Sequence, residues 1–186
     1  MTLVTERLLL RRWKDSDYEP FAALNADPEV RKYFPGVLSR AESDESIERI
    51  EGWFDSRGYG LWAVERLDTG EFIGFTGLAP MPDGVPGAGG VEVGWRLARA
   101  HWRQGFASEA ARSSLVFAFD DLGLAEVNSI TAIANTPSRA VMERIGMTFV
   151  DEFEHPGVPE GSALRPHVRY LVSKQQFSRD RPKIAS

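Results

Sequence analysis

The apolar residues of this chain follow two different repeats in turn, and this alternation restricts the fold more than any other feature. A repeat of two residues predicts a strand, whereas apolar residues three and four positions apart predict a helix. In chain order the repeats predict a strand, helices, three strands, a helix, a strand, a helix and two strands. This order is typical of one mixed α/β sheet with helices on both faces.

The boundaries of these elements follow from where each repeat begins and ends. The seven expected strands are 7–12, 60–66, 71–78, 91–97, 126–134, 147–153 and 167–173. The expected helices are 18–25, one that begins after Ser39, 108–119 and 137–145.

Three sites carry the residue types that start helices. Asp15 is expected to cap the first helix, and Asp27 followed by Pro28 reads as an N-cap with proline at the first helical position. Ser39 and Glu42 have the spacing of a capping box, in which each side chain bonds the other residue's backbone N–H. We therefore expect helices to begin after all three.

Turn signals divide the rest of the chain. Asp68, Thr69 and Gly70 predict a hairpin turn, and the glycine- and proline-rich stretch 79–90 is expected to be a mobile loop. No linker composition interrupts the chain, so we expect one domain over 1–173. The polar tail 174–186 is expected to fray.

The composition excludes several classes of protein. The chain has no cysteine, which rules out disulfides and a cysteine nucleophile and fits the cytoplasm. His101, His155 and His167 lack the spacing of metal ligands, so no metal site is expected. A formal charge of −5 without a basic stripe argues against nucleic acid, and no apolar run is long enough for a signal peptide or a membrane helix.

The segment most suited to ligand binding joins the strand 91–97 to the helix that follows. The first turn of a helix has unpaired N–H groups and the positive end of the dipole, and Gly105 would let a ligand approach this backbone. A pyrophosphate would fit at 104–108, with Arg103 adding charge-assisted contacts. The turn has neither the lysine of a Walker A loop nor the three glycines of a Rossmann loop. By itself it leaves open whether phosphate binds or a helix simply begins.

Four segments in the right order resemble the GNAT acetyltransferases, and in particular their RimJ/RimL-type branch. The run R-Q-G-F-A-S-E-A resembles the family's pyrophosphate loop, Q/R-x-x-G-x-G/A. The runs T-E-R-L-L-L-R, V-E-V-G-W-R-L and N-T-P-S-R-A-V-M-E-R-I-G-M fall where that branch has comparable segments. The resemblance extends from Thr5 to Ser173. It implies the GNAT fold, a mostly antiparallel mixed sheet in which two neighbouring strands splay apart to admit a cofactor.

The resemblance also implies the cofactor, acetyl-CoA, and the residues that would hold it. The backbone at 95–97 would pair with the pantetheine arm, and one N–H there would polarise the thioester carbonyl. Arg139 would lie near the phosphates, although a solvated helix face explains this residue as well. The implied cofactor-binding residues are Trp95, Arg96, Leu97, Arg103, Gln104, Gly105, Phe106, Ala107, Ser108, Asn135 and Arg139.

Acetyl transfer to an amine needs a group that removes a proton, because an ammonium is not a nucleophile. Glu92 is the candidate base, since strand alternation puts Glu92 and Gly94 on the face opposite Val93. The alternative is a carboxylate on the wet face of a strand. Without cysteine, direct attack in a ternary complex is expected instead of an acetyl-enzyme.

The leaving thiolate needs a proton or a hydrogen bond. Many GNAT enzymes supply a tyrosine here, but 136–146 contains none. Ser138 stands where the RimJ/RimL branch tends to have a serine, and Asn135 could hold the pantetheine or a catalytic water. The alternatives are a serine that satisfies the first helical turn and an asparagine that forms the preceding turn.

The acceptor is the least constrained part of the prediction. Tyr33 and Phe34 are expected to line its pocket, as that region does in the family. The acceptor could be a protein N-terminal amine or a small amine such as an amino acid, a polyamine or an aminoglycoside. A silent acyl-CoA-binding domain and a nucleotide-binding module are the alternatives from other classes. Many family members are homodimers, and the sequence leaves the oligomeric state open.

Overall fold

The computed structural model describes residues 2–180, which form two compact units. The first unit comprises Met1–Ala79 and Val93–Ser114, and the second comprises Pro80–Glu92 and Leu115–Ser186. The boundary falls within strand β5, so this strand contributes to both units.

Eight strands form a mixed sheet within residues 2–180, one more than expected. The strand order is β1-β2-β3-β4-β5 through the first unit and β5-β6-β8-β7 through the second. The additional strand has only two residues, too few for a sequence repeat. The strands are β1 Leu3–Val4, β2 Leu8–Arg11, β3 Leu61–Arg66, β4 Phe72–Pro80, β5 Val91–Leu97, β6 Glu126–Ala132, β7 Thr148–Glu154 and β8 Pro166–Ser173.

The helices and helical turns connect these strands. They are η1 Asp15–Asp17, α1 Tyr18–Ala26, α2 Arg40–Arg57, η2 Arg99–His101, α3 Phe106–Val116, the π-helical turn η3 Phe117–Asp121, α4 Thr136–Arg144 and α5 Lys174–Asp180.

The core of the first unit joins α1 and α2 to β4. Phe21 and Ile47 from the two helices are almost fully buried with Phe75 of β4. The rings of Phe21 and Phe75 meet edge-on with centroids 5.9 Å apart. This apolar contact holds α1 and α2 against β4, which is the neighbour of β5 in the sheet.

The predicted capping box is confirmed, and the first helix begins at Tyr18 as expected but without Asp15 as its cap, whereas the helix start at Pro28 is wrong. Ser39 caps α2, and its hydroxyl and the Glu42 carboxylate bond reciprocally to the two backbones. Asp15 lies inside η1, and Asp17 becomes the N-cap of α1 without a side-chain cap bond. After Pro28 the chain forms successive turns up to residue 33 and no helix. The carboxylate of Asp27 does accept from Glu29 N–H, but a cap cannot sustain a helix by itself.

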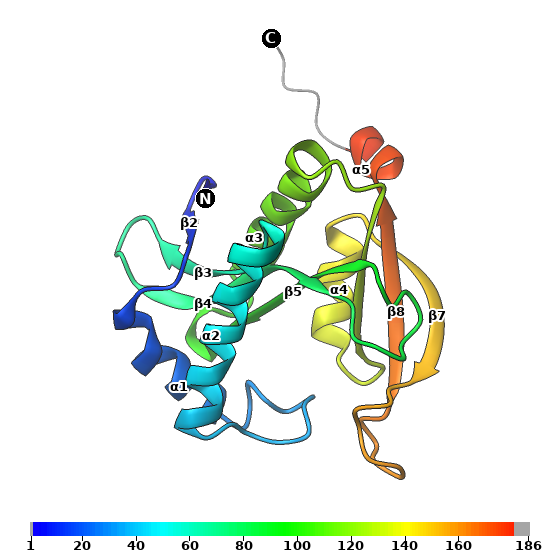
Figure 1. The fold of residues 1–186 in the computed structure, drawn as a ribbon, viewed down its shortest axis with the longest axis horizontal. Helices are drawn as coiled ribbons and strands as arrows, with labels where there is room; N and C mark the ends of the chain where they lie inside the picture. The colour runs from blue at the N-terminus through cyan, green and yellow to red at the C-terminus, as the bar shows by residue number, and fades with distance from the viewer. Residues whose placement is uncertain (1, 181–186) are drawn as a thin grey trace. The chain divides into compact units, whose positions relative to one another are not determined.

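The second unit includes part of the tail that was expected to fray. Phe177 of α5 is buried, and its ring lies 5.2 Å from that of Phe119. Lys174 Nζ donates to the carbonyl of Phe119 at 2.7 Å. Figure 1 shows α5 continuing directly from β8. Residues 174–180 are therefore folded, because one aromatic side chain anchors an otherwise polar helix; the rest of the predicted tail lies outside the described residues.

A buried ion pair in the first unit gives a stability prediction. Arg11 donates to both carboxylate oxygens of Asp17, at 2.6 and 2.9 Å, and to Glu65 at 2.7 Å. The Asp17 side chain is only 2% exposed. Asp17→Ala should lower the free energy of unfolding by about 3–5 kcal/mol, because it leaves a buried charge less compensated. Urea denaturation measures this change.

The matched control removes a carboxylate from an exposed pair. Asp68 bonds Arg66 at 2.6 Å, but its side chain is 64% exposed. Asp68→Ala should change the unfolding free energy far less, because water already screens that pair. Equal losses in the two variants would contradict the role given to burial.

Candidate active site

Strand β5 places Glu92, Gly94 and Arg96 on one face and Val93 and Leu97 on the other. Val93 and Leu97 are buried at 1% and 5% exposure, and they alternate with partly exposed Glu92, Gly94 and Arg96. A strand turns successive side chains to opposite faces, so the parity expected for Glu92 is the parity observed.

The backbone of β5 lies very close to that of β4. A Cβ built on Gly74 would lie 2.2 Å from the carbonyl oxygen of Arg96 and 2.8 Å from Leu97 Cα. Thr76 Oγ1 donates to the carbonyl of Gly94 at 3.1 Å. Only glycine fits at position 74, and the close approach fixes the backbone at 95–97 that the sequence assigns to cofactor contact.

The predicted phosphate loop is an exposed turn directly before α3. Arg103 and Gly105 both have a positive φ, 60° and 84°, and Phe106 then begins the helix with its side chain buried. The helix starts two residues earlier than expected because the left-handed glycine turns the chain immediately before it. Of the other residues expected to contact the cofactor, Gln104 is exposed and Trp95, Ala107 and Ser108 are partly exposed.

Arg7 holds this loop in place, a role that sequence reasoning missed. Its Nη1 donates to the carbonyl of Gln104 at 3.0 Å, and its Nη2 lies 2.6 Å from Glu109 Oε2. The guanidinium also lies 4.5 Å from the centre of the Phe106 ring. Arg7 therefore binds the loop through a carbonyl group. The N–H groups at the start of α3 remain available to bind an anion.

The glycine of this loop has no side chain, which leaves space for a phosphate beside the backbone. A Cβ at Gly105 would fill the space beside the backbone and come within 3.3 Å of Arg7 Nη2. The first N–H groups of α3 and the Arg103 side chain are donors suited to a phosphate. The loop can therefore accommodate a pyrophosphate.

Glu92 lies where β5 joins β6. It pairs with Asn128 in the one parallel bridge of these strands, whereas β6 and β8 share a ladder of seven pairs. Desolvation by burial raises the pKa of the Glu92 carboxyl to about 8. A carboxylate with such a pKa can accept a proton near neutral pH far better than an ordinary glutamate.

Asn128 is a polar group that sequence reasoning did not single out. It is 2% exposed, and its Oδ1 accepts from Arg169 Nη1 at 3.3 Å. Arg169 in turn bonds both carboxylate oxygens of Asp151, at 3.1 and 2.8 Å. No clear signal in the sequence pointed to it, because β6 also contains the polar residues Ser129 and Thr131.

Asn135 and Ser138 lie together at the start of α4. Asn135 is the N-cap, and its Oδ1 accepts from the backbone N–H of Ser138 at 3.3 Å. Its Nδ2 donates to Thr131 Oγ1 at 2.9 Å. Both polar atoms of the Asn135 side chain therefore form hydrogen bonds at the start of α4. Ser138 is partly exposed, and only its backbone N–H takes part in the cap.

Arg139 lies against the neighbouring strand. Its Nε donates to the Tyr170 hydroxyl at 3.4 Å and its Nη1 to the carbonyl of Ile133 at 3.3 Å. The hydrogen bond with Tyr170 raises the pKa of the Arg139 guanidinium. These contacts account for its position, and its contact with cofactor phosphates stays a prediction.

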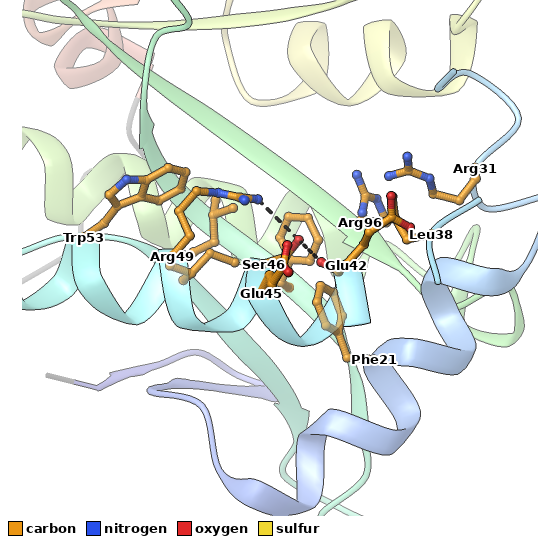
Figure 2. A pocket seen from close by; sticks show the side chains of 12 residues that line it. Phe21, Arg31, Leu38, Glu42, Glu45, Ser46, Arg49, Trp53 and Arg96 are labelled. Atoms are coloured by element: carbon orange, nitrogen blue, oxygen red, sulfur yellow. Dashed lines mark hydrogen bonds between the residues drawn. The ribbon is translucent and has the colours of Figure 1, made fainter. Parts of the chain in front are cut away.

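The predicted acceptor residues follow α1, and Phe34 contacts two arginines that line a cavity, although neither predicted residue lines it. Phe34 is 36% exposed, with its ring centre 4.4 Å from the Arg96 guanidinium carbon and 4.6 Å from that of Arg31. Tyr33 is partly exposed, with its ring 5.9 Å from Lys32 Nζ. Arg31 and Arg96 line a cavity of about 380 Å³ beside α2 (Figure 2).

Two expectations concern absences. Within residues 2–180, no group of three or more His, Asp or Glu side chains could hold a metal ion. No helix in the same range is long and apolar enough to cross a membrane.

Comparison with known proteins agrees with the resemblance seen in the sequence. The family model described as an acetyltransferase (GNAT) domain matches residues 7–148. An FsC-acetyl coenzyme A-N(2)-transacetylase from Aspergillus fumigatus is 33% identical over 193 residues, which cover 96% of this chain and 78% of that protein.

Two solved structures have a similar fold. A GNAT-family acetyltransferase from Bacillus anthracis has a TM-score of 0.78 and 25% identity, covering 94% of this chain and 99% of its own. RimL, a ribosomal L7/L12 alpha-N-protein acetyltransferase in complex with coenzyme A, has a TM-score of 0.74 and 17% identity, covering 93% and 98%. At that identity, RimL shows the fold alone.

Proposed function

The chain belongs to the GNAT family of acetyltransferases and is an acyltransferase, and we propose that it moves an acetyl group from acetyl-CoA to a primary amine. The observation that carries this proposal is the glycine turn before α3, which offers a bare backbone and helix N–H groups to a pyrophosphate. The name of the Aspergillus relative, which specifies acetyl coenzyme A and transfer to nitrogen, supports the same donor and reaction.

The loop residues would hold the donor. When bound, acetyl-CoA supplies a thioester whose carbonyl carbon an amine can attack. The N–H groups at 104–108 and the Arg103 guanidinium would bind the pyrophosphate. The backbone at 95–97, fixed against Gly74, would orient the pantetheine arm and polarise the carbonyl.

Glu92 would act as the base. The raised pKa of its carboxyl, about 8, suits a group that must take a proton from an acceptor ammonium near neutral pH. Its position in the bridge to Asn128 gives the carboxylate a fixed backbone. In this role Glu92 accepts the proton at a carboxylate oxygen, directly or through a water.

Ser138 would assist departure of the thiolate with its hydroxyl, while Asn135 fixes the start of α4. Ser138→Ala keeps the backbone N–H that the Asn135 cap needs. We therefore expect kcat to fall about tenfold to a hundredfold, the value of one hydrogen bond to a charged group, with no rise in the apparent KM for acetyl-CoA. Steady-state kinetics measure both parameters.

The neighbouring hydroxyl provides the control. Thr136 is an exposed residue of the same helical turn, so Thr136→Ala should leave kcat near that of the wild type. A wild-type kcat in Ser138→Ala would leave this serine with only its part in the helix.

The acceptor is proposed to be a protein N-terminal amine, as in the RimJ/RimL-type branch. The support is the sequence resemblance to that branch. A small-molecule amine such as an amino acid, a polyamine or an aminoglycoside is the second candidate. Location in the cytoplasm and a homodimer stay predictions.

Thiol release from acetyl-CoA tests the proposal. The purified protein is offered N-terminal peptides and small amines, and free coenzyme A is measured. Release that depends on peptide sequence supports a protein N-terminus, and release with small amines alone supports the second candidate. Binding of acetyl-CoA without release for any amine would contradict the proposed catalysis and favour a silent acyl-CoA-binding domain.

A further inference from the structure

Three arginines line the cavity beside α2, and two of them, Arg31 and Arg96, lie at the same end of it. Arg31 and Arg96 each line it, and within residues 2–180 neither has a carboxylate oxygen within 4.0 Å. By contrast, Arg11, Arg12 and Arg40 of the same unit all form ion pairs. Charges that are partly removed from water are normally paired, so this pair needs an explanation.

Both guanidinium groups are held in place by neutral contacts. The Arg96 guanidinium lies between the rings of Phe34 and Phe75, 4.4 and 5.1 Å from their centres, and its Nη1 donates to Asn25 Oδ1 at 2.7 Å. Arg31 Nε donates to the carbonyl of Gly36 at 2.7 Å. Stacking and single hydrogen bonds orient the planes without neutralising the charges.

Several donors of this pair remain without an acceptor. The Nε of Arg96 is buried and has no hydrogen-bond partner. The two Nη groups of Arg31 make no hydrogen bond within the described part of the chain. An unsatisfied buried donor costs free energy, which a bound acceptor atom would recover.

The two charges also act on each other. Burial and then the charge of Arg31 lower the pKa of Arg96 to about 9, and burial lowers the pKa of Arg31. Figure 2 shows both guanidinium groups at the same end of the cavity, with Arg49 and Trp53 at the other end. The charge of a bound anion would raise both pKa values again.

The carboxylate of Glu42 lines the cavity and its charge acts on Arg31, but its hydrogen bonds go to the cap of α2. Glu42 Oε2 accepts from the backbone N–H and the hydroxyl of Ser39, each at 2.7 Å, as part of the α2 cap. One negative charge thus stands against two positive charges at this end. Glu45 also lines the cavity, but it is exposed on α2.

The remaining walls of the cavity are apolar, which indicates that the rest of the ligand is apolar too. Phe21, Ile50 and Phe75 are buried residues that line the cavity, together with partly exposed Leu38 and Leu61. A cavity of about 380 Å³ is within the range of small-molecule sites. The walls suit an apolar group that ends in an anion.

We propose that this cavity binds a carboxylate of the acceptor through Arg31 and Arg96, so that the preferred acceptors are amines that carry a carboxylate and an apolar group. The identification of the ligand as the acceptor rests on the proposed function. Binding of a carboxylate in this cavity can be measured without any turnover. Arg96 follows Glu92 by four residues on the same face of β5, which connects the site to the strand that bears the proposed base. Guanidinium groups bind the planar carboxylate with paired hydrogen bonds.

Calorimetry with an unreactive pair of probes tests the site directly. The probes are 3-phenylpropionate and its isosteric neutral amide, 3-phenylpropionamide. The wild type should bind the acid about tenfold to a hundredfold more tightly than the amide, the range of hydrogen bonds to charged groups. Arg31→Gln and Arg96→Gln should each reduce this ratio at least about tenfold.

The control variant removes a positive charge from α2 at a position outside the cavity. Arg57 is exposed in the last turn of the helix and lies outside the cavity lining, so Arg57→Gln should keep the wild-type ratio. Because Arg31 is at the cavity rim and only partly buried, Arg31→Gln remains informative if Arg96→Gln fails to fold. Equal binding of acid and amide by the wild type, or an equal loss in Arg57→Gln, would overturn the proposal.

Turnover then distinguishes the source of the carboxylate. One pair of acceptors is a free amino acid and its amide, and the other is a C-terminally amidated peptide with Glu or Gln at its second position. A kcat/KM preference in the first pair identifies an α-carboxylate, and one in the second identifies an acidic side chain. If calorimetry supports the site while no amine releases thiol, the proposed function fails and the carboxylate site stands; turnover without preference in either pair overturns the site's role in acceptor choice.

Discussion

Glu92→Gln should lower kcat/KM for the acceptor by about a hundredfold to ten-thousandfold, the range that a positioned general base contributes. Glutamine has nearly the same shape but cannot take a proton. The affinity for acetyl-CoA should hardly change, because the proposed donor contacts lie in the backbone at 95–97 and at 103–108. Thiol release and calorimetry measure the two effects separately.

The control for this prediction is a glutamate on the other strand of the same pair. Glu126 is exposed at the start of β6, and Glu126→Gln should leave kcat/KM unchanged. Unchanged turnover in Glu92→Gln at neutral pH would remove Glu92 from the role of base.

The pH dependence follows from the same raised pKa. With a carboxyl pKa of about 8, the rate should rise with pH through that value and level off above it. An acceptor amine whose own pKa lies well below neutrality ensures that only the enzyme titrates. Glu92→Gln should lack this rise, and a profile shared with the wild type would assign the titration to another group.

Stability should change with pH in the opposite direction. The folded state keeps the Glu92 proton up to about pH 8, whereas the unfolded chain releases it near the ordinary glutamate value of 4.5. The unfolded state therefore binds fewer protons between these values, and this group's contribution to stability falls as pH rises. The melting temperature of Glu92→Gln should decline less than that of the wild type from pH 5 to pH 8.

Gly105→Val should weaken acetyl-CoA binding by about tenfold or more. The glycine has a φ of 84°, where a β-branched residue is strained by about 1–3 kcal/mol, and its Cβ would lie 3.3 Å from Arg7 Nη2. The loop must shift to relieve these contacts, which moves the backbone away from a bound pyrophosphate. Calorimetry with acetyl-CoA measures the loss.

A second left-handed glycine separates the site from general strain. Gly89 also has a φ of 84°, but a Cβ there would meet no atom within 4 Å. Gly89→Val should leave acetyl-CoA affinity unchanged even if it lowers the melting temperature. Equal affinity in Gly105→Val and the wild type would refute the phosphate role of this turn.

The sequence predicted features that depend on few neighbouring residues. The Ser39 capping box, the extent of β5 and the parity of Glu92 are confirmed, because a cap needs four residues and a strand face needs only alternation. The turn at Gly105 does lie directly before a helix, although the helix begins two residues earlier than expected, and phosphate binding there stays a prediction.

Local signals failed where packing decides between alternatives. Asp27–Pro28 has the residue types of a helix start, yet turns follow it and place Val30 in the core of the first unit. Residues 174–180 have a polar composition, yet Phe177 anchors them as a helix. A short helix depends on tertiary contacts more than on its own residues.

The sequence by itself determined the family, the order of elements and the positions of the candidate base and phosphate turn, because these follow from short-range repeats and motifs. Only the tertiary structure decided the chemical state of those groups and their neighbours. Burial raises the pKa of Glu92, and folding brings Asn25, Arg31 and Arg96 together. Desolvation and contacts between residues some seventy positions apart depend on how the chain packs, which no local pattern encodes.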